Sequence, residues 1–244
     1  MVQPYRRTYT VCPQHLDCFG RLKASALLYF IQEISGEHAA QLDAGWDTLQ
    51  EKHLFWAIIR HRVQITRLPE AGETITLETW PMPTTRVAYP RSVVAYDEAG
   101  NECFRSIAIW VLMDVNTRSM VLPGKSGISV DGTLRGMELA APGSLVPKEL
   151  SRQAQRSVCF TDLDRNGHMN NTKYMDWIDD LLPSAFHREH SVTEFTVCYL
   201  SETREGQTLH LHWDFLEEGT VQVDAHRISG ENAERVFSAR LIYG

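Results

Sequence analysis

Apolar side chains recur at helical spacing in two segments of the chain. In each segment they occupy positions i, i+3, i+4 and i+7, which places them on one face of a helix. The first stripe consists of Leu27, Phe30, Ile31 and Ile34, and the second of Tyr174, Trp177, Ile178 and Leu181. The sequence therefore predicts two amphipathic helices, and we expect the second to stop or bend at Pro183.

Most of the remaining chain alternates between apolar and polar residues, as half-buried strands do. Glycine-containing turns, such as residues 70–73 and 204–207, separate these segments. The predicted strands contain residues 63–65, 75–79, 93–96, 104–113, 197–199, 209–213, 221–223 and 236–243. A helix followed by several strands, twice over, is typical of an α+β fold.

The two halves of the chain share this order and several aligned positions. An offset of 147 residues places the first apolar stripe on the second and Gly20 on Gly167. Further along, an offset of 134 residues places Gly72 on Gly206. The shared order favours an internal repeat over two unrelated α+β domains. The change of offset predicts 13 extra residues in the first half, around residues 45–56.

The segment from Leu122 to Arg156 is rich in Gly, Pro and Ser and is predicted to connect the two copies. This gives an N-terminal repeat over residues 1–122, a linker over 123–156 and a C-terminal repeat over 157–244. One long helix and one antiparallel sheet leave a helix face and a sheet edge uncovered. We therefore expect the two repeats to pair as a pseudo-dimer.

The densest cluster of polar residues runs from Asp162 to Trp177, directly before and into the second predicted helix. Its carboxylates, amides and histidine exceed what a turn requires. We expect Asn170 or Asn171 to cap the helix. The free backbone N–H groups at the start of that helix could then face a developing negative charge.

Comparison of the two halves distinguishes the polar residues of this cluster that the fold requires from those that it does not require. The aligned residues of the first half lack the amide, the imidazole and the carboxylate of the second. Asn166, His168 and Glu202 align with Phe19, Arg21 and Leu68, respectively. Because the fold does not need the polar set twice, the asymmetry predicts one active centre per chain. We expect that centre to contain Asp164, Asn166, His168 and Glu202.

Composition narrows the classes of function. The chain has 244 residues, 43% of them hydrophobic, and a formal net charge of −7, which argues against a nucleic-acid binder. It contains no signal-peptide pattern and no apolar run of membrane-spanning length, so we expect a cytoplasmic location. Five scattered cysteines without a CxxC pair argue against a disulfide framework or a zinc site, and His210 and His212 are expected to be plain surface residues.

At the polar cluster the sequence resembles the acyl-acyl carrier protein thioesterases of plants and bacteria. The second half carries their DLDxNxHxNNxKYxxW pattern intact, and Glu202 in the segment YLSE matches the catalytic glutamate of that family. In plant members a cysteine follows this glutamate, whereas Thr203 stands here. The first half matches through Trp56–Arg62, Thr79–Trp80 and Ile109–Arg118. The resemblance implies a tandem, or double, hotdog fold, in which each half is a long helix wrapped by an antiparallel sheet.

The resemblance also implies a reaction: hydrolysis of fatty acyl-acyl carrier protein, which releases the free fatty acid and ends chain elongation, without a cofactor or metal. Glu202 would act as general base or as nucleophile. His168 and Asn166 would orient water and thioester, and Asp164 would hold them in position. Thr203 makes a mechanism that depends on cysteine at that position doubtful for this chain.

Substrate selection is expected mainly in the first half. The candidate residues for the acyl slot are Trp56, Leu27, Ile31 and Trp80. Because the acyl carrier protein is acidic, a local basic patch is expected despite the negative net charge. The candidates for that patch are Arg6, Arg7, Arg60 and Arg62. Whether the chain also forms a homodimer is left open.

Two alternatives remain from the sequence. A hotdog thioesterase acting on coenzyme A thioesters would share the catalytic residues and differ in its docking surface. A non-catalytic acyl-binding protein would need an apolar slot and no base. The intact set of Asn166, His168 and Glu202 weighs against this second alternative.

Overall fold

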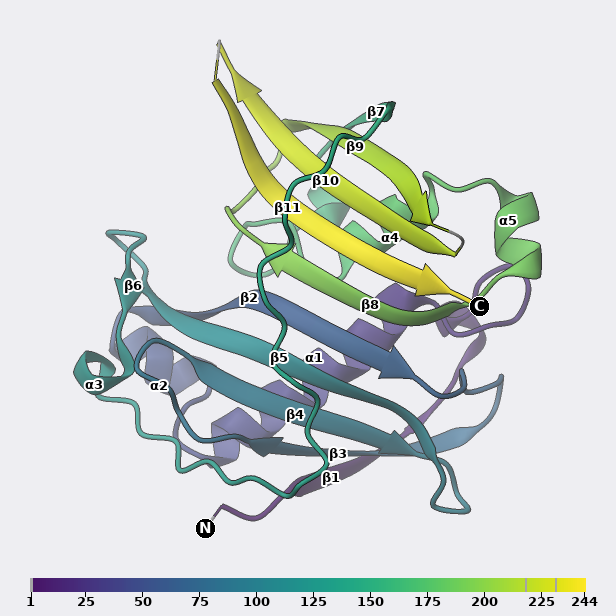
Figure 1. Cartoon of the computed structure of the whole chain (residues 1–244). Helices are drawn as coiled ribbons and strands as arrows, with labels where there is room; N and C mark the ends of the chain where they lie inside the picture. The colour runs from purple at the N-terminus through teal and green to yellow at the C-terminus, as the bar shows by residue number, and fades with distance from the viewer. Residues whose placement is uncertain (1, 218, 231) are drawn as a thin grey trace. The chain divides into compact units, whose positions relative to one another are not determined.

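A computed structural model describes residues 2–217, 219–230 and 232–244 (Figure 1). The chain divides into two compact units, an N-terminal unit over Met1–Pro142 and a C-terminal unit over Gly143–Gly244. The division falls inside the segment 123–156 that the sequence predicts as a linker. Each unit combines helix with antiparallel sheet, which confirms the predicted α+β class.

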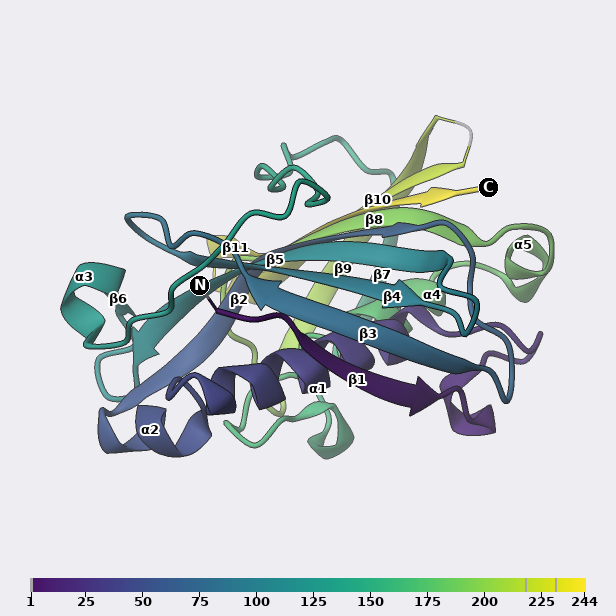
Figure 2. The same cartoon turned by 90° about the horizontal axis from the view of Figure 1, so that it is seen from below.

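The N-terminal unit is built on a five-stranded antiparallel sheet with the order β1-β3-β4-β5-β2. Its strands are β1 (Tyr5–Thr10), β2 (Leu54–Ile65), β3 (Thr74–Pro81), β4 (Tyr89–Tyr96) and β5 (Glu102–Asp114), and β6 (Met120–Val121) pairs with β5. Helices α1 (Ala24–Gln41) and α2 (Trp46–Glu51) lie on one face of this sheet (Figure 2). The segment that follows α3 (Pro123–Ser126) crosses the opposite face (Figure 1).

Helix α1 confirms the first predicted apolar stripe. Leu27 and Ile34 are 0% exposed because the stripe faces the sheet, and Ile31 is 1% exposed. Helix α2 and the start of β2 occupy the extra residues that the change of repeat offset predicts. A short 3-10 helix, η1 (Pro13–His15), precedes α1.

The C-terminal unit has its own antiparallel sheet with the order β8-β11-β10-β9-β7. Its strands are β7 (Arg152–Ser157), β8 (Val192–Tyr199), β9 (Thr208–Glu217), β10 (Thr220–Ser229) and β11 (Asn232–Tyr243). The 3-10 helix η2 (Phe160–Asp162) precedes helix α4 (Lys173–Asp179), and α5 (Ser184–Glu189) follows. Strand β7 overlaps the end of the predicted linker and pairs with β9, so residues 152–156 belong to the sheet of the C-terminal unit.

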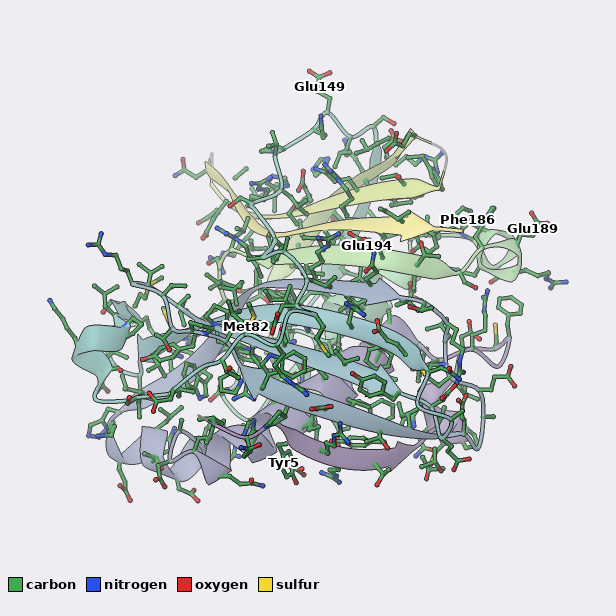
Figure 3. All side chains as sticks on the ribbon, turned by 60° about the horizontal axis from the view of Figure 1, so that its bottom comes forward. Tyr5, Met82, Glu149, Phe186, Glu189 and Glu194 are labelled. Carbon is green, nitrogen blue, oxygen red and sulfur yellow. The ribbon has the colours of Figure 1, made fainter. Side chains whose placement is uncertain are left out.

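The second predicted helix stops before Pro183, as expected, but it is not the long helix that the resemblance implied. Helix α4 ends at Asp179, and Leu181 lies beyond it. Pro183 then starts a separate helix, because proline cannot donate the backbone hydrogen bond that a continuous helix requires. Phe186 lies on this second helix (Figure 3). Its ring packs against those of Tyr243 and Phe215, with ring centroids 5.0 and 5.3 Å apart. Two short helices therefore take the place of one.

The internal repeat is visible in matching backbone hydrogen bonds. In the N-terminal unit, the N–H of Gly72 donates to the carbonyl of Val11 at 2.8 Å. In the C-terminal unit, the N–H of Gly206 donates to the carbonyl of Val158 at 2.9 Å. The offsets of 147 and 134 residues relate these two pairs, so both units join the same strand start to the same turn.

Within the described residues, no helix combines the length and apolarity required to cross a bilayer. Nor does the described part of the chain bring three His, Cys, Asp or Glu side chains into a metal-binding arrangement. All five cysteines are free.

Candidate active site

The loop between η2 and α4 carries three of the four predicted catalytic residues. Leu163 and Met169 form an isolated antiparallel bridge that closes the loop. Inside it, the N–H of Asp164 donates to the carbonyl of His168 at 2.8 Å, and the N–H of Gly167 donates to the carbonyl of Asp164 at 3.0 Å. Gly167 has φ of 73°, a left-handed conformation that glycine adopts without strain.

The carboxylate of Asp164 holds this loop together. Its Oδ1 accepts hydrogen bonds from the backbone N–H groups of Asn166 at 2.8 Å and His168 at 3.3 Å. The side-chain amide of Asn166 donates to its Oδ2 at 3.3 Å. Asp164 therefore fixes the loop backbone and the amide of Asn166, which agrees with a positioning function.

His168 and Glu202 face each other. His168 Nε2 lies 3.2 Å from Glu202 Oε2, within hydrogen-bonding distance. The histidine is buried, with 7% of its surface exposed, whereas the side chain of Glu202 is 33% exposed. A carboxylate open to solvent beside a buried imidazole can hold a water molecule and accept its proton.

The segment that carries Glu202 leaves β8 and is anchored on both sides. The N–H of Met169 donates to the carbonyl of Thr203 at 2.8 Å, which joins this segment to the catalytic loop. Arg227 on β10 donates from Nη1 to the backbone carbonyl of Glu202 at 2.8 Å and from Nη2 to Ser201 Oγ at 3.2 Å. Arg227 could not be identified from the sequence, because a side chain that binds a backbone carbonyl of a distant segment leaves no motif.

Thr203, which follows the candidate catalytic residue Glu202, is turned into the core. It is 1% exposed, and its hydroxyl lies 2.6 Å from the phenol oxygen of Tyr174. Burial raises the pKa of Tyr174 to about 12, so this phenol stays neutral and cannot activate the threonine as a base. Cys198 is also buried, with its Sγ 3.8 Å from the carbonyl of Gly143. Neither residue is placed as a nucleophile.

The prediction that Asn170 or Asn171 caps α4 is wrong. Thr172 is the N-cap, and its N–H donates to Asn170 Oδ1 at 3.0 Å. The N–H groups of Met169 and Asn170 donate to the carbonyls of Thr203 and Asp162. These donors are already used by the loop, so they are not available to an oxyanion.

Two of the predicted acyl-slot residues lie on the face of α1 that is packed against the sheet. Leu27 and Ile31 are 0% and 1% exposed. Trp56 on β2 is half-buried, packs against the apolar cluster around Leu49 and Leu112, and donates its indole N–H to the carbonyl of Ala44 at 2.8 Å. These three residues remain candidates for the slot.

Trp80 lies on the other face of the sheet. Its neighbour Thr79 accepts a hydrogen bond from Arg91, which also contacts His38 of α1, so Thr79 is on the helix face. Side chains alternate along a strand, and Trp80 therefore faces away from α1. Its indole N–H donates to Glu138 at 3.0 Å, in the segment that crosses that opposite face. The structure does not bring Trp80 together with Leu27 and Ile31.

The arginines predicted for the docking patch are held within their own unit. Arg6 pairs with the buried Glu78 at 2.8 Å, and Arg7 pairs with Glu37. Arg60 donates to the carbonyl of Pro142 at 3.4 Å. Arg62 is half-buried on β2. Ion pairing of Arg6 and Arg7 neutralises the charge that the patch would need.

Comparison with solved structures defines the class of fold as a double hotdog. The chain is similar to an acyl-ACP thioesterase from Bacteroides thetaiotaomicron, with a TM-score of 0.84, 23% identity, and coverage of 99% of this chain and 98% of the other. It is also similar to the 12:0-ACP thioesterase from Umbellularia californica, with a TM-score of 0.83, 21% identity, and coverage of 99% and 97%. The predicted tandem hotdog is therefore confirmed.

Sequence comparison then places the chain more narrowly. The model of the acyl-ACP thioesterase N-terminal domain matches residues 3–122, and that of the C-terminal domain matches residues 146–243. The chain belongs to the acyl-ACP thioesterase family. It is 25% identical over 213 residues to the chloroplastic dodecanoyl-[acyl-carrier-protein] hydrolase of Cinnamomum camphora, with coverage of 81% of this chain and 56% of that protein. The chain thus spans about half the length of the curated relatives it matches.

Proposed function

We propose that this chain hydrolyses the thioester of fatty acyl-acyl carrier protein, releasing the free fatty acid and ending chain elongation. The observation that carries the proposal is the contact of His168 Nε2 with Glu202 Oε2 at 3.2 Å. It occurs in the unit that holds the intact family motif and matches the family's C-terminal domain. A protein that only binds acyl chains would gain nothing from this pair.

In the proposed mechanism Glu202 is the general base. Its carboxylate accepts a proton from water while the water oxygen attacks the thioester carbonyl carbon. The carbon–sulfur bond of the tetrahedral intermediate then breaks, and the carrier thiolate takes up the proton. His168 positions the water or the carboxylate, and the amide of Asn166 orients the carbonyl oxygen. Asp164 holds Asn166 in place through the 3.3 Å amide contact.

Direct nucleophilic attack by Glu202 is the second form of the mechanism. It would form a mixed anhydride between Glu202 and the acyl group, which water then cleaves. Acid quenching during turnover followed by intact-mass measurement separates the two forms. An added acyl mass on the chain supports the anhydride, and unmodified protein at every time point supports the general base.

The proposed function is tested with a panel of acyl thioesters of graded chain length, on acyl carrier protein and on coenzyme A. We expect hydrolysis of acyl-acyl carrier protein with a higher kcat/KM than that of the matching coenzyme A thioester. Faster turnover of the coenzyme A series would support the coenzyme A thioesterase instead. Binding of acyl groups without release of fatty acid would support the acyl-binding protein.

Glu202→Gln serves as the matched control for the panel because it keeps the shape of the side chain and removes its basicity. We expect it to lose nearly all turnover, and full activity in this variant would contradict the general-base role. We also propose that the reaction takes place in the cytoplasm, with acyl carrier protein as partner. Fluorescence microscopy of a tagged chain in its source cells tests the location. Light scattering of the purified chain tests whether it forms a homodimer.

A further inference from the structure

We propose that Phe160, Arg165 and Arg204 form the surface on which the acidic carrier protein docks. This inference rests on the proposed function and names the partner-binding residues of the same site. All three residues belong to the C-terminal unit, and none of them is among the arginines that the sequence suggested.

The three residues surround the candidate catalytic pair. Phe160 is in η2, at the entry to the catalytic loop, and Arg165 is between Asp164 and Asn166. Arg204 is two residues beyond Glu202, and its Nη2 lies 3.8 Å from Glu202 Oε2. Backbone hydrogen bonds of 2.9 Å from Gly206 to Val158 and 2.8 Å from Met169 to Thr203 hold the two loops side by side.

All three side chains face solvent. Phe160 is 76% exposed, more than any other large apolar residue in the described part of the chain. The side chain of Arg204 is 56% exposed, and Arg165 is exposed as well. The ring of Phe160 adds no burial energy to the fold, and a partner docked at this rim would bury it, as aromatic residues are buried at the centre of protein interfaces.

The internal repeat shows that the fold does not require these residues. At the aligned positions of the N-terminal unit the same backbone is built without an exposed aromatic ring or a cation. Phe160, Arg165 and Arg204 align with Pro13, Cys18 and Glu70, respectively. The replacement at Arg204 is a reversal of charge. These substitutions occur in the unit that also gained Asn166, His168 and Glu202.

The negative net charge of the chain explains why an acidic partner would need positively charged residues near the site. With a net charge of −7 the chain repels an acidic protein at long range, so docking needs local positive charge near the site. The neighbouring acids Asp162 and Asp164 accept hydrogen bonds from backbone N–H groups of the loop, at 2.9 and 2.8 Å. Glu205 is exposed beside Arg204 and opposes it. Arg165 and Arg204 supply the cationic groups of this rim, and the carboxylate of Glu202, 3.8 Å from Arg204, offsets part of that charge.

The test compares three thioesters of one acyl group: acyl-acyl carrier protein, acyl-coenzyme A and acyl-N-acetylcysteamine. The first presents an acidic protein surface and a phosphate, the second presents only the phosphates of the coenzyme, and the third presents neither. For Arg165→Glu with Arg204→Glu, and separately for Phe160→Asp, kcat/KM for acyl-acyl carrier protein should fall at least about tenfold more than for the other two thioesters. Arg188→Glu on α5, an exposed arginine of the same unit, is the control for net charge and should not change that ratio.

Two further measurements sharpen the assignment. Added salt should weaken the wild-type reaction with acyl-acyl carrier protein more than that of the double variant, because screening acts on the charges the variant has lost. Glu205→Gln should lower KM for acyl-acyl carrier protein by removing a repulsive charge.

Three outcomes overturn the docking surface. Equal losses with all three thioesters would mean that the variants damage the site itself. Losses with acyl-carrier protein and coenzyme A alike would assign the arginines to the phosphate. Unchanged rates in both variants would place docking elsewhere. If the wild-type chain hydrolyses none of the thioesters, the proposed function fails first, and that result is distinct from the other three.

Discussion

The loops over residues 12–22 and 159–169 share the same backbone hydrogen bonds but carry different side chains. In the N-terminal unit, Asp17 Oδ1 accepts hydrogen bonds from the N–H groups of Phe19 at 2.8 Å and Arg21 at 2.9 Å. In the C-terminal unit, the carboxylate of Asp164 accepts the equivalent bonds at 2.8 and 3.3 Å. The aspartate and the following glycine therefore build the loop, and the residues between them are free to vary.

The side chains that differ make contacts within the first loop, whereas in the second loop they contact another segment of the chain. Arg21 pairs with Asp17 at 3.1 Å and stacks over the ring of Phe19, with its Cζ 5.1 Å from the ring centroid. In the second loop, His168 turns instead to Glu202, a residue from a different segment. The comparison supports the proposal that Asp164 positions the loop, whereas Asn166, His168 and Glu202 carry the chemistry.

The largest effect is expected when the second loop is given the side chains of the first. Glu202→Leu copies Leu68, and His168→Arg copies Arg21. Each substitution should lower kcat by about 100- to 10,000-fold, because it removes the base or its partner. Circular dichroism and thermal unfolding should show a folded chain, since the N-terminal unit already tolerates these residues. Retained turnover in Glu202→Leu would contradict the proposal that Glu202 distinguishes the catalytic half of the chain from the other half.

A smaller loss is expected from Arg227, which holds the backbone of Glu202 rather than its carboxylate. Arg227→Ala should reduce kcat by about 10- to 100-fold with little change in KM, because misplacement of a catalytic group costs rate more than affinity. Arg227→Lys can restore one donor and should recover part of the rate. Added guanidinium should rescue Arg227→Ala, and absence of rescue together with a collapsed melting temperature would assign Arg227 to stability alone.

The N-terminal unit should respond to acid more strongly than the C-terminal unit, where burial also lowers the pKa of a histidine, His226. Burial lowers the pKa of His61 to about 3, and burial with the nearby Arg91 lowers the pKa of His38 to about 4. Both are below the unfolded value of about 6.5, so the unfolded state binds more protons as pH falls through this range. The N-terminal unit should therefore lose stability from about pH 6.5 downwards. Hydrogen exchange of α1 and β2 at pH 7 and pH 5 measures this, and His61→Leu should reduce the difference.

Strands and the first helix could be predicted where one face is buried. Strand β5 and helix α1 follow their apolar patterns closely. Strands β1 and β7 could not be predicted, because these edge strands, YRRTYT and RQAQRS, contain few apolar residues to alternate. The two-helix arrangement of α4 and α5 was missed because the apolar stripe continues past the point where α4 ends.

The sequence predicted that His168 and Glu202 belong to one site, and the structure places them 3.2 Å apart; the prediction was possible because the two halves of the chain can be compared with each other. Asn166, His168 and Glu202 stand out against their counterparts in the repeat. Arg227 and the face of Trp80 could not be predicted in the same way. The contact of Arg227 depends on which distant segments are brought together in the fold. The side of the sheet on which Trp80 lies depends on which of the alternating side chains of β3 face α1.

A moderate effect, shared by both units, is expected from the loop aspartates. Asp17→Ala and Asp164→Ala each remove two bonds to backbone N–H groups and should each lower the free energy of unfolding by about 1–2 kcal/mol. Only Asp164→Ala should also lower kcat, since the loop of Asp17 has no counterpart of Asn166, His168 or Glu202. Asp164→Asn keeps an acceptor oxygen and should retain more activity than the alanine variant. Loss of turnover in Asp17→Ala without loss of stability would show that the loops are not equivalent in the way described.

The smallest effect should be nearly the same in both loops. Gly20 and Gly167 have φ of 80° and 73°, and a Cβ at either position would meet no atom within 4 Å. Alanine there costs only the strain of a left-handed backbone, about 1 kcal/mol. Gly20→Ala and Gly167→Ala should therefore lower the melting temperature by similar amounts, roughly 2–4 °C in a chain of this size. Because the strain is purely local, a large difference between the two variants would mean that the second loop is held under tension by the contact of His168 with Glu202.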